Sequence, residues 1–219
     1  MSENFLERVW AYREEKIYPE LFGDLGPGIF TLDGGDFQNV FQRSPDPRWL
    51  FTGVFECPPC SKHADWVYVS SGLSNPWEQE EPKDLPDQPS WLGIEFIFRT
   101  TEQGPWAIRM VQRIVAYEIL LAHDQFEGYG RLGFGDRVPL RGPIDPGSES
   151  ALTYLLIAPP ADFPKLFQLE SGGVDFVQLV GISEAEAAFG RENGLDALIQ
   201  LLADHDAYVI TNPRRKSIV

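Results

Sequence analysis

The soft metal ligands of this chain lie close together in one short segment. Cys57 and Cys60 enclose two prolines, and His63 follows three residues later. A structural zinc site normally has four ligands, so Asp65 would have to complete this one. A redox pair would need a helix after the second thiol to lower the thiol pKa, and none is predicted there. We therefore keep Cys57, Cys60 and His63 as a weak metal candidate, beside the simpler interpretation of two ordinary thiols in a proline-stiffened loop.

A second pattern, the glycines of segment 128–133, formally matches a dinucleotide-binding turn. That turn works when a strand precedes it and a helix follows it, because the helix N-terminus then meets the pyrophosphate. Here a predicted helix precedes the glycines and extended residues follow them. The sequence also contains no G-x-S-x-G nucleophile elbow, and no spacing singles out two carboxylates as an acid and base pair. We expect neither catalysis nor a cofactor.

The charge balance says more about partners than any catalytic motif. The chain has 33 Asp and Glu against 18 Lys and Arg, which gives a net charge of −15. Such a field repels nucleic acids and anionic membranes, because both require a basic footprint. It also speeds the encounter with a basic partner. Many cytosolic bacterial proteins are as acidic without having such a partner, so the charge alone leaves both interpretations open.

The N-terminus and the apolar runs bear on location and domain number. The first ten residues carry acidic groups where a secretory signal needs a positive region and an apolar stretch. No apolar run approaches the roughly 18 residues that span a bilayer. We therefore expect a cytoplasmic protein. Because no linker or internal repeat is evident, a single domain over residues 1–219 is the simplest prediction.

Apolar periodicity predicts three helices, over 2–18, 105–121 and 195–203, and a capping box that begins at Ser183 predicts a fourth. In the first helix Arg13 and Lys16 interrupt the apolar arc, and we expect them to reach solvent from its edge. In the second helix Glu118 lies near the middle of the apolar arc. It either pairs with a buried cation or escapes to solvent at the helix end, and we favour the escape.

Runs of aromatic and β-branched residues between turn-forming residues predict the strands. The predicted strands cover 28–32, 37–43, 49–56, 65–70, 92–100, 151–158, 174–182 and 207–211. Between two of them, segment 75–90 holds four prolines and five carboxylates. It is too rich in proline for regular structure and too acidic to be buried.

Several short segments resemble, in order, those of the suppressor of fused family. The first, Trp66-Val67-Tyr68-Val69-Ser70-Ser71-Gly72-Leu73-Ser74, follows the family pattern of Trp, a spacer, Tyr, an aliphatic residue, Ser and then Gly-Leu-Ser. The others are Gly93 to Arg99, Trp106 with its helix, Gly135-Asp136, Ser148-Glu149-Ser150, 176–182, Asn193-Gly194 and 210–215. Each segment is weak alone, but the ordered series over 66–215 is specific.

This resemblance implies an α/β fold of the α+β type, a single domain with a central mixed β-sheet flanked by helices. It also implies a binding role. Animal members sequester zinc-finger transcription factors by clamping an extended peptide between two domains, and many single-domain bacterial members are regarded as immunity proteins. The second half of that clamp would lie beyond Val219, so binding of the animal type is not carried over.

The resemblance also suggests where a partner would bind. Tyr68 occupies the place of the family's strand tyrosine, near the peptide-binding side, although a core position is the alternative. The acidic segment follows Gly-Leu-Ser, as a peptide-contacting loop does in the animal proteins. The predicted partner-binding residues are Tyr68, Trp77, Glu78, Glu80, Glu81 and Asp84.

We therefore predict a non-catalytic domain that binds a protein or peptide partner, such as a basic toxin that it would neutralise as an immunity protein. The alternatives are a scaffold or oligomeric structural domain and, with less support, a hydrolase or zinc-dependent enzyme. The sequence does not indicate an oligomeric state.

Overall fold

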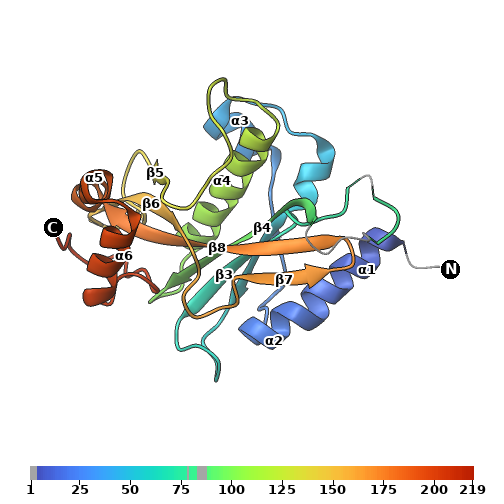
Figure 1. Cartoon of the computed structure of the whole chain (residues 1–219), viewed down its shortest axis with the longest axis horizontal. Helices are drawn as coiled ribbons and strands as arrows, with labels where there is room; N and C mark the ends of the chain where they lie inside the picture. Colours follow the sequence, from blue (N-terminus) through green and yellow to red (C-terminus); the bar gives the residue numbers. More distant parts are fainter. Residues whose placement is uncertain (1–3, 78, 83–87) are drawn as a thin grey trace.

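A computed structural model describes residues 4–77, 79–82 and 88–219 (Figure 1). The described residues form a mixed sheet with the strand order β1-β2-β3-β4-β8-β6-β5, and β7 pairs with β8 off this path. The β4–β8 pair is parallel and the other pairs are antiparallel. The strands are β1 Phe30–Thr31, β2 Gly53–Cys57, β3 Trp66–Ser71, β4 Pro89–Thr100, β5 Arg137–Pro139, β6 Leu152–Ala158, β7 Leu166–Leu169 and β8 Gly172–Ser183.

Helices cover both faces of this sheet. An N-terminal helix lies on one face, α3 and α4 lie on the other, and α5 and α6 pack beside β6 and β8 (Figure 1). The helical segments are α1 Phe5–Tyr12, η1 Arg13–Ile17, α2 Tyr18–Phe22, α3 Gly34–Phe41, η2 Pro47–Phe51, α4 Pro105–Ala122, α5 Glu184–Asn193 and α6 Leu195–Asp204. The predicted α+β class with a central mixed sheet is confirmed. None of the described helices combines the length and apolarity that a membrane span requires.

The side chains of the central strands alternate between two cores. Val67 and Val69 of β3 pack under the N-terminal helix, whereas Tyr68 packs with Phe96 and Phe98 of β4 under α4. Successive side chains of a strand point to opposite faces of the sheet, so this division follows from the strand period of two. β3 and β4 are therefore buried on both sides, and their positions are fixed tightly.

The N-terminal helix ends four residues later than the predicted 2–18. It begins at Phe5, passes through the π-helical turn η1 and ends before Gly23, whose φ is +78°. Pro19 does not stop it, because the π-turn directly before Pro19 already shifts the backbone hydrogen-bond register. The last predicted strand, 207–211, is reduced to one isolated bridge from Thr211 to Thr100.

The strand predicted over 37–43 is wrong, because that segment lies mainly in helix α3. Asp33 caps this helix by accepting hydrogen bonds from two amides of its first turn. The apolar residues Phe37, Val40 and Phe41 have the spacing i, i+3, i+4 of a helix face. Likewise, the first residues of the strand predicted over 49–56 form the 3-10 helix η2, and the strand begins at Gly53.

Two charged residues that we expected to reach solvent are buried. Arg13 is 1% exposed, and Glu118 is fully buried. Glu118 accepts hydrogen bonds from Arg131 Nε at 2.6 Å and from the Leu132 amide at 2.9 Å. Burial raises its pKa against the lowering effect of these two donors. The pairing alternative therefore holds for Glu118, although the Arg131 side chain itself is partly exposed.

Candidate functional site

The turn that follows β3 wraps around one buried carboxylate, that of Glu95 on β4. One oxygen of Glu95 accepts hydrogen bonds from the Gly72 amide at 2.9 Å and from the Ser74 amide and hydroxyl at 3.0 and 2.6 Å. The other oxygen accepts from the Ser70 hydroxyl at 2.5 Å. A carboxylate that receives this many donors fixes the turn from Ser70 to Ser74 in one conformation.

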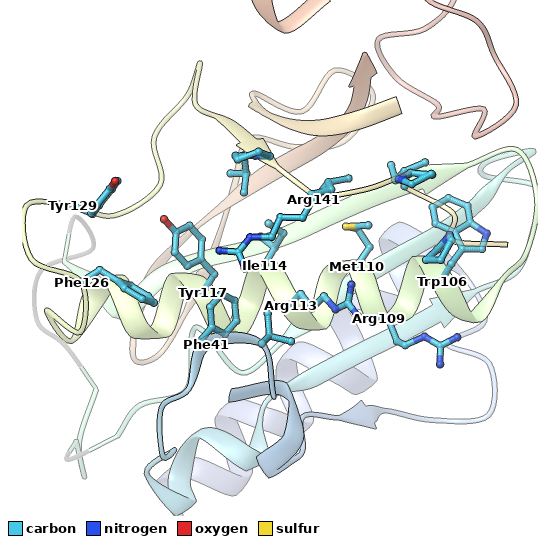
Figure 2. Close-up of a pocket in the computed structure, with 17 residues that line it drawn as sticks. Phe41, Trp106, Arg109, Met110, Arg113, Ile114, Tyr117, Phe126, Tyr129 and Arg141 are labelled. Carbon is cyan, nitrogen blue, oxygen red and sulfur yellow. The ribbon is translucent and has the colours of Figure 1, made fainter. Parts of the chain in front are cut away.

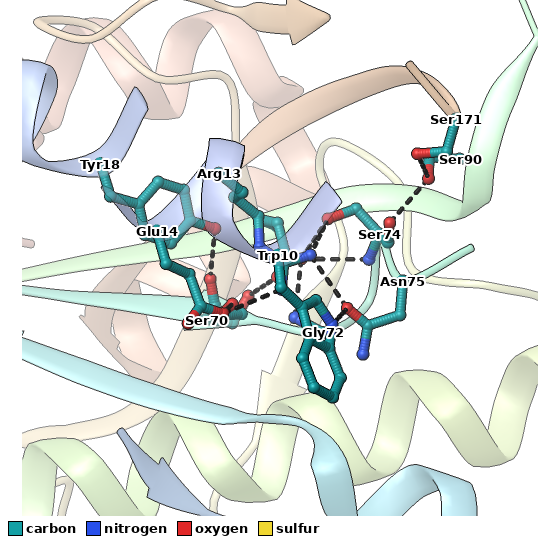
Figure 3. Close-up of polar contacts among 12 residues, drawn as sticks. Trp10, Arg13, Glu14, Tyr18, Ser70, Gly72, Ser74, Asn75, Ser90 and Ser171 are labelled. Atoms are coloured by element: carbon teal, nitrogen blue, oxygen red, sulfur yellow. Dashed lines mark hydrogen bonds and ion pairs between the residues drawn. The ribbon is translucent and has the colours of Figure 1, made fainter. Parts of the chain in front are cut away.

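The buried guanidinium of Arg13 completes this network from the N-terminal helix (Figure 3). Its Nη1 lies 3.8 Å from the Glu95 carboxylate and donates to Ser74 Oγ and Asn75 Oδ1 at 2.9 and 3.0 Å. Its Nη2 donates to Glu14 at 3.0 Å. A buried cation needs such partners, since an uncompensated charge in the core costs several kcal/mol. The N-terminal helix is thus tied to the turn after β3.

The same network joins the two ends of the acidic segment 75–90, and we call this junction its base. The Ser90 hydroxyl donates to the Ser74 carbonyl at 2.6 Å, and the Leu92 amide donates to the Leu73 carbonyl at 3.1 Å. Ser90 also shares a hydrogen bond of 2.6 Å with Ser171. The residues that precede and follow the acidic segment are therefore joined to each other and to the sheet.

A row of aromatic rings lies beside this base. Ring centroids are 6.2 Å apart for Trp10 and Phe51, 6.2 Å for Phe51 and Trp77, and 6.4 Å for Trp77 and Trp91. The ring of Phe51 is 57% exposed, and the other three are partly exposed. Trp10 Nε1 donates to Asn75 at 2.6 Å, which joins the row to the buried network.

One member of this row has a strained backbone. Trp91 has a φ of +48°, and it lies where the register of β4 against β8 shifts, between Pro89 and Ile94. A bulky residue with positive φ costs about 1 to 3 kcal/mol and persists where the surroundings impose it. Glu80 and Glu81, which follow Trp77 by three and four residues in the sequence, are exposed. We call the set Trp10, Phe51, Trp77, Glu80, Glu81 and Trp91 the acidic aromatic patch.

The structure separates the predicted partner-binding residues. Trp77, Glu80 and Glu81 lie in the acidic aromatic patch, whereas Glu78 and Asp84 lie outside the described residues. Tyr68 is fully buried under α4, where its hydroxyl accepts a hydrogen bond from the Gly104 amide at 3.2 Å. Burial also raises the pKa of its phenol, so Tyr68 is a neutral core residue in this structure rather than a surface contact.

Two rings of the patch, Trp10 and Phe51, are not among the binding residues predicted from the sequence. The predicted helix 2–18 includes Trp10, and the predicted strand 49–56 includes Phe51. The available signal was the pair Asp46-Pro47, since an Asp cap followed by Pro begins a short helix. A helix that ends at Phe51 turns this ring outward, where an inward-facing strand position would bury it.

The cysteine and histidine candidates do not converge on a metal site. Among the described residues, no three His, Cys, Asp or Glu side chains are placed to hold a metal ion. Both ring nitrogens of His63 face backbone carbonyls, those of Asp65 at 2.8 Å and Phe22 at 2.9 Å. Burial raises the pKa of Cys57 to about 12, which disfavours the thiolate that a metal would need.

A groove along one side of α4 is a second candidate (Figure 2). Its volume is about 480 Å³, and it lies between α4, the end of α3 and the segment from Phe126 to Pro146. Its charged lining residues are Arg109, Arg113 and Arg141. We call it the arginine groove. The other lining residues are Val40, Phe41, Trp106, Met110, Ile114, Tyr117, Phe126, Tyr129, Val138, Pro139, Leu140, Pro143, Ile144 and Pro146.

Comparison with known proteins identifies the family. A family model described as suppressor of fused protein (SUFU) matches residues 52–216, which is most of the chain. The chain belongs to the SUFU family. This match confirms the resemblance found in the sequence, and it extends that resemblance by a short stretch at its N-terminal side. No curated protein matches the chain.

Solved structures of SUFU proteins share its fold. The Sufu–Fu complex crystal structure aligns with a TM-score of 0.66 at 22% identity, over 98% of this chain and 92% of that one. Suppressor of Fused from Drosophila aligns with a TM-score of 0.58 at 23% identity, over 76% of this chain and 42% of that one. A putative SUFU homologue from Neisseria gonorrhoeae FA 1090 gives 0.55 at 22%, over 77% and 78%.

The SUFU match covers one part of the site and does not cover the other. The matched region includes the turn Ser70 to Ser74 and its carboxylate Glu95, so the Gly-Leu-Ser element has a structural role here as a carboxylate cradle. Trp10, Arg13 and Phe51 precede residue 52 and lie outside the match. The cation of the network and two rings of the patch therefore come from a segment that the family model does not cover.

Proposed function

We propose that this SUFU-family chain is a non-catalytic protein-binding domain that recognises a basic partner through the acidic aromatic patch. The observation that carries the proposal is the exposed Phe51 ring, set in a row of indole rings, with the exposed carboxylates Glu80 and Glu81 three and four residues after Trp77 in the sequence. Aromatic anchors surrounded by charge are typical of binding surfaces, because they bury a large area with little loss of side-chain entropy. The buried network beneath them reduces the cost of ordering the surface on binding.

The expected charge of the partner follows from the exposed carboxylates of the patch and from the net charge of the chain. Both described carboxylates of the patch are exposed, and the net charge of the chain is −15. This field would steer a basic protein toward the patch in a salt-dependent manner. One of the matched crystal structures is that of a Sufu–Fu complex, so a protein of this fold is known in complex with another protein.

A role in binding rather than catalysis fits the state of the buried carboxylates. Glu95, Glu118 and Glu186 are fully buried, and each is committed to donors from its own turn or from an arginine. Groups bound in this way hold backbone turns in place, and their oxygens are already occupied by these donors. Of the histidines, His63 is held by two carbonyls.

The finer form of the proposal is an immunity protein that neutralises a toxin by surface binding. Its support is the acidity of the chain and the exposed aromatic anchor, both of which suit a basic toxin. The test is coexpression with a toxin candidate encoded beside this chain. Wild type should restore growth, and the triple variant F51A/E80Q/E81Q should not. Growth arrest that persists with wild type would contradict the immunity role but leave protein binding in place.

Protein binding itself is tested with a displayed library of random twelve-residue peptides. Immobilised wild type should enrich peptides rich in Lys and Arg with an aromatic residue, and raising the salt should reduce their capture. F51A/E80Q/E81Q should lose this enrichment. The matched control F134A/E149Q/E192Q, which changes exposed residues elsewhere, should keep it. Equal enrichment by both variants would exclude the patch as the binding surface.

A further inference from the structure

We propose that the arginine groove is a second binding site, for an acidic peptide that carries aromatic or aliphatic side chains. This site differs from the acidic aromatic patch in its lining and in the sign of its charge, and it does not depend on the patch being functional. The proposal begins from composition. In a chain with 33 acidic and 18 basic residues, a groove whose charged lining residues are all arginines departs from the average surface.

The lack of pairing with other described residues distinguishes these arginines from those that stabilise the fold. Within the described part of the chain, neither an ion pair within 4.0 Å nor a guanidinium hydrogen bond is found for Arg109, Arg113 or Arg141. By contrast, Arg13 and Arg99 are each paired with carboxylates. Unpaired guanidinium groups around one groove are ready to bind carboxylates, and their planar donors suit bidentate contact.

The carboxylates near the groove are already engaged elsewhere. Asp36, which feels the charge of Arg113, accepts a hydrogen bond from the Asp33 amide at 2.8 Å in the cap of α3. Asp136, near Tyr117, accepts from the Gly133 amide at 2.8 Å. Asp145 accepts from the Gly147 amide at 3.0 Å. Each stabilises its own turn, so the arginines keep their capacity for an outside anion.

Two features of these arginines make the fold less stable, and they therefore indicate a role in recognition. Arg109 and Arg113 are four residues apart on α4, where like charges destabilise a helix by roughly 0.2 to 0.5 kcal/mol. Arg141 has a φ of +59°, a left-handed conformation that is unfavourable for a residue with a Cβ atom. Residues held in such conformations cluster at binding sites.

The apolar lining sets the second requirement for the ligand. Figure 2 shows Phe126 and Tyr129 at one end of the groove and Trp106 at the other, with Arg113 and Arg141 between them. Tyr129 is 67% exposed, and Phe41 and Tyr117 stack with their centroids 5.6 Å apart. A ligand that satisfies these surfaces needs apolar side chains flanking its negative charges.

The length of the groove favours a short peptide. From Trp106 to Tyr117 the helix rises about 16 Å, the span of about five residues of an extended chain. The opposite wall contains Pro139, Pro143 and Pro146, which stiffen it and reduce the entropy lost on binding. Nucleic acid is disfavoured because its many phosphates would meet the whole negative field of the protein, whereas a short peptide carries few charges.

The peptide is expected to bind by its side chains rather than by adding a strand. β5 is the terminal strand of the sheet, and the two residues that flank it bond to β6 through the Leu140 amide and the Asp136 carbonyl. Because backbone directions alternate along a strand, the groups of Arg137 and Pro139 point away from β6. Pro139 has no N–H to donate, so this free edge is poorly suited to pair with another strand.

The test uses a displayed library of random twelve-residue peptides with three immobilised proteins. Wild type should enrich peptides that carry several Asp or Glu and at least one aromatic residue. The groove variant R109Q/R113Q/R141Q should bind the enriched peptides about tenfold more weakly in fluorescence anisotropy, because three charge pairs are lost. The control K165Q/R191Q/K216Q changes the net charge equally at exposed positions elsewhere and should bind as wild type does.

A single substitution, Tyr129→Ala, guards against a folding defect in the triple variant. This side chain is mostly exposed, and its loss should weaken the same peptides severalfold while the unfolding midpoint stays unchanged. The proposal is overturned if wild type enriches no acidic peptides, or if the groove variant and the control bind them equally. It is also overturned if sedimentation shows a dimer that R109Q/R113Q/R141Q dissociates, because a second copy would then occupy the groove.

Discussion

The acidic aromatic patch and the arginine groove use charge in opposite ways. Beneath the patch the charges are buried and paired: Arg13 meets Glu14 and Glu95, and Glu95 meets four donors. Around the groove the arginines are exposed and, among the described residues, unpaired. Buried pairs hold the backbone in one arrangement, whereas exposed charges without partners remain available for recognition.

The two regions are also neighbours through one helix end. His123, which caps α4, contacts Trp91 of the patch at 6.3 Å and Trp49 at 4.8 Å between ring centroids. Tyr117 of the groove lies less than two turns earlier on the same helix. A variant that loosens the end of α4 would therefore affect both surfaces, so tests of the comparison must use exposed side chains with matched controls.

The largest expected effect is on stability, from Arg13→Met. This change keeps the apolar stem but leaves Glu95 buried without its cation, and removing one partner of a buried pair typically costs about 3 to 5 kcal/mol. Urea unfolding should show that loss. Arg191→Met, at an exposed position, should change the free energy of unfolding by less than about 0.5 kcal/mol. A loss below about 1 kcal/mol for Arg13→Met would show that the network does not depend on this ion pair.

Glu186→Gln measures how much a buried ion pair outside both surfaces contributes to stability. Burial acts to raise the pKa of Glu186, but hydrogen bonds from Arg215 and the Ser183 amide outweigh it and leave the pKa below the ordinary value of 4.5. The ionised form therefore stabilises the fold above about pH 4.5, and this contribution is lost as the pH falls through the folded-state pKa. We expect the substitution to cost about 2 kcal/mol at pH 7, and progressively less as the pH falls below 4.5, measured by urea unfolding.

Phe51→Ala should separate binding from folding in the patch. The ring is 57% exposed, so the free energy of unfolding should change by less than about 0.5 kcal/mol. Binding of a basic partner should weaken by about 2 kcal/mol, or roughly thirtyfold, if the ring is a binding anchor. Calorimetric titration with a selected basic peptide measures this loss of affinity. Unchanged affinity would place the anchor elsewhere in the row of rings.

The smallest expected effect, and the one with the opposite sign, comes from Arg113→Gln. It removes the like-charge pair with Arg109 on α4 and should raise the free energy of unfolding by about 0.2 to 0.5 kcal/mol at low salt. Loss of its attraction to Asp36 works against this gain. High salt should abolish the difference. A variant less stable than wild type would mean that Arg113 serves the fold rather than recognition.

The sequence predicted elements whose signal is local. β3, β4 and α4 were placed correctly, because their residues alternate or repeat over many positions. The capping box at Ser183 likewise starts α5 as expected. The aromatic content of segment 37–43 favours a strand, although its helical spacing and the Asp33 cap indicate the helix that the structure shows.

What the sequence could not give were contacts between distant positions. Arg13 was expected in solvent because its partner Glu95 lies 82 residues further along the chain. Glu118 was misplaced for the same reason, since its donors lie beyond a glycine-rich turn. The patch was half predicted through Trp77, Glu80 and Glu81, but Phe51 joins them only because η2 turns it outward. The arginine groove is lined by three separate chain segments, so no single sequence pattern predicts it.

The central claim is that one acidic chain presents two recognition surfaces of opposite charge, and a single selection experiment tests it directly. Wild type, F51A/E80Q/E81Q and R109Q/R113Q/R141Q are challenged in parallel with the same library of twelve-residue peptides. We expect wild type to enrich two peptide classes, one basic and one acidic. The patch variant should lose only the basic class, and the groove variant only the acidic class. Loss of the same class in both variants, or of neither, would contradict the account.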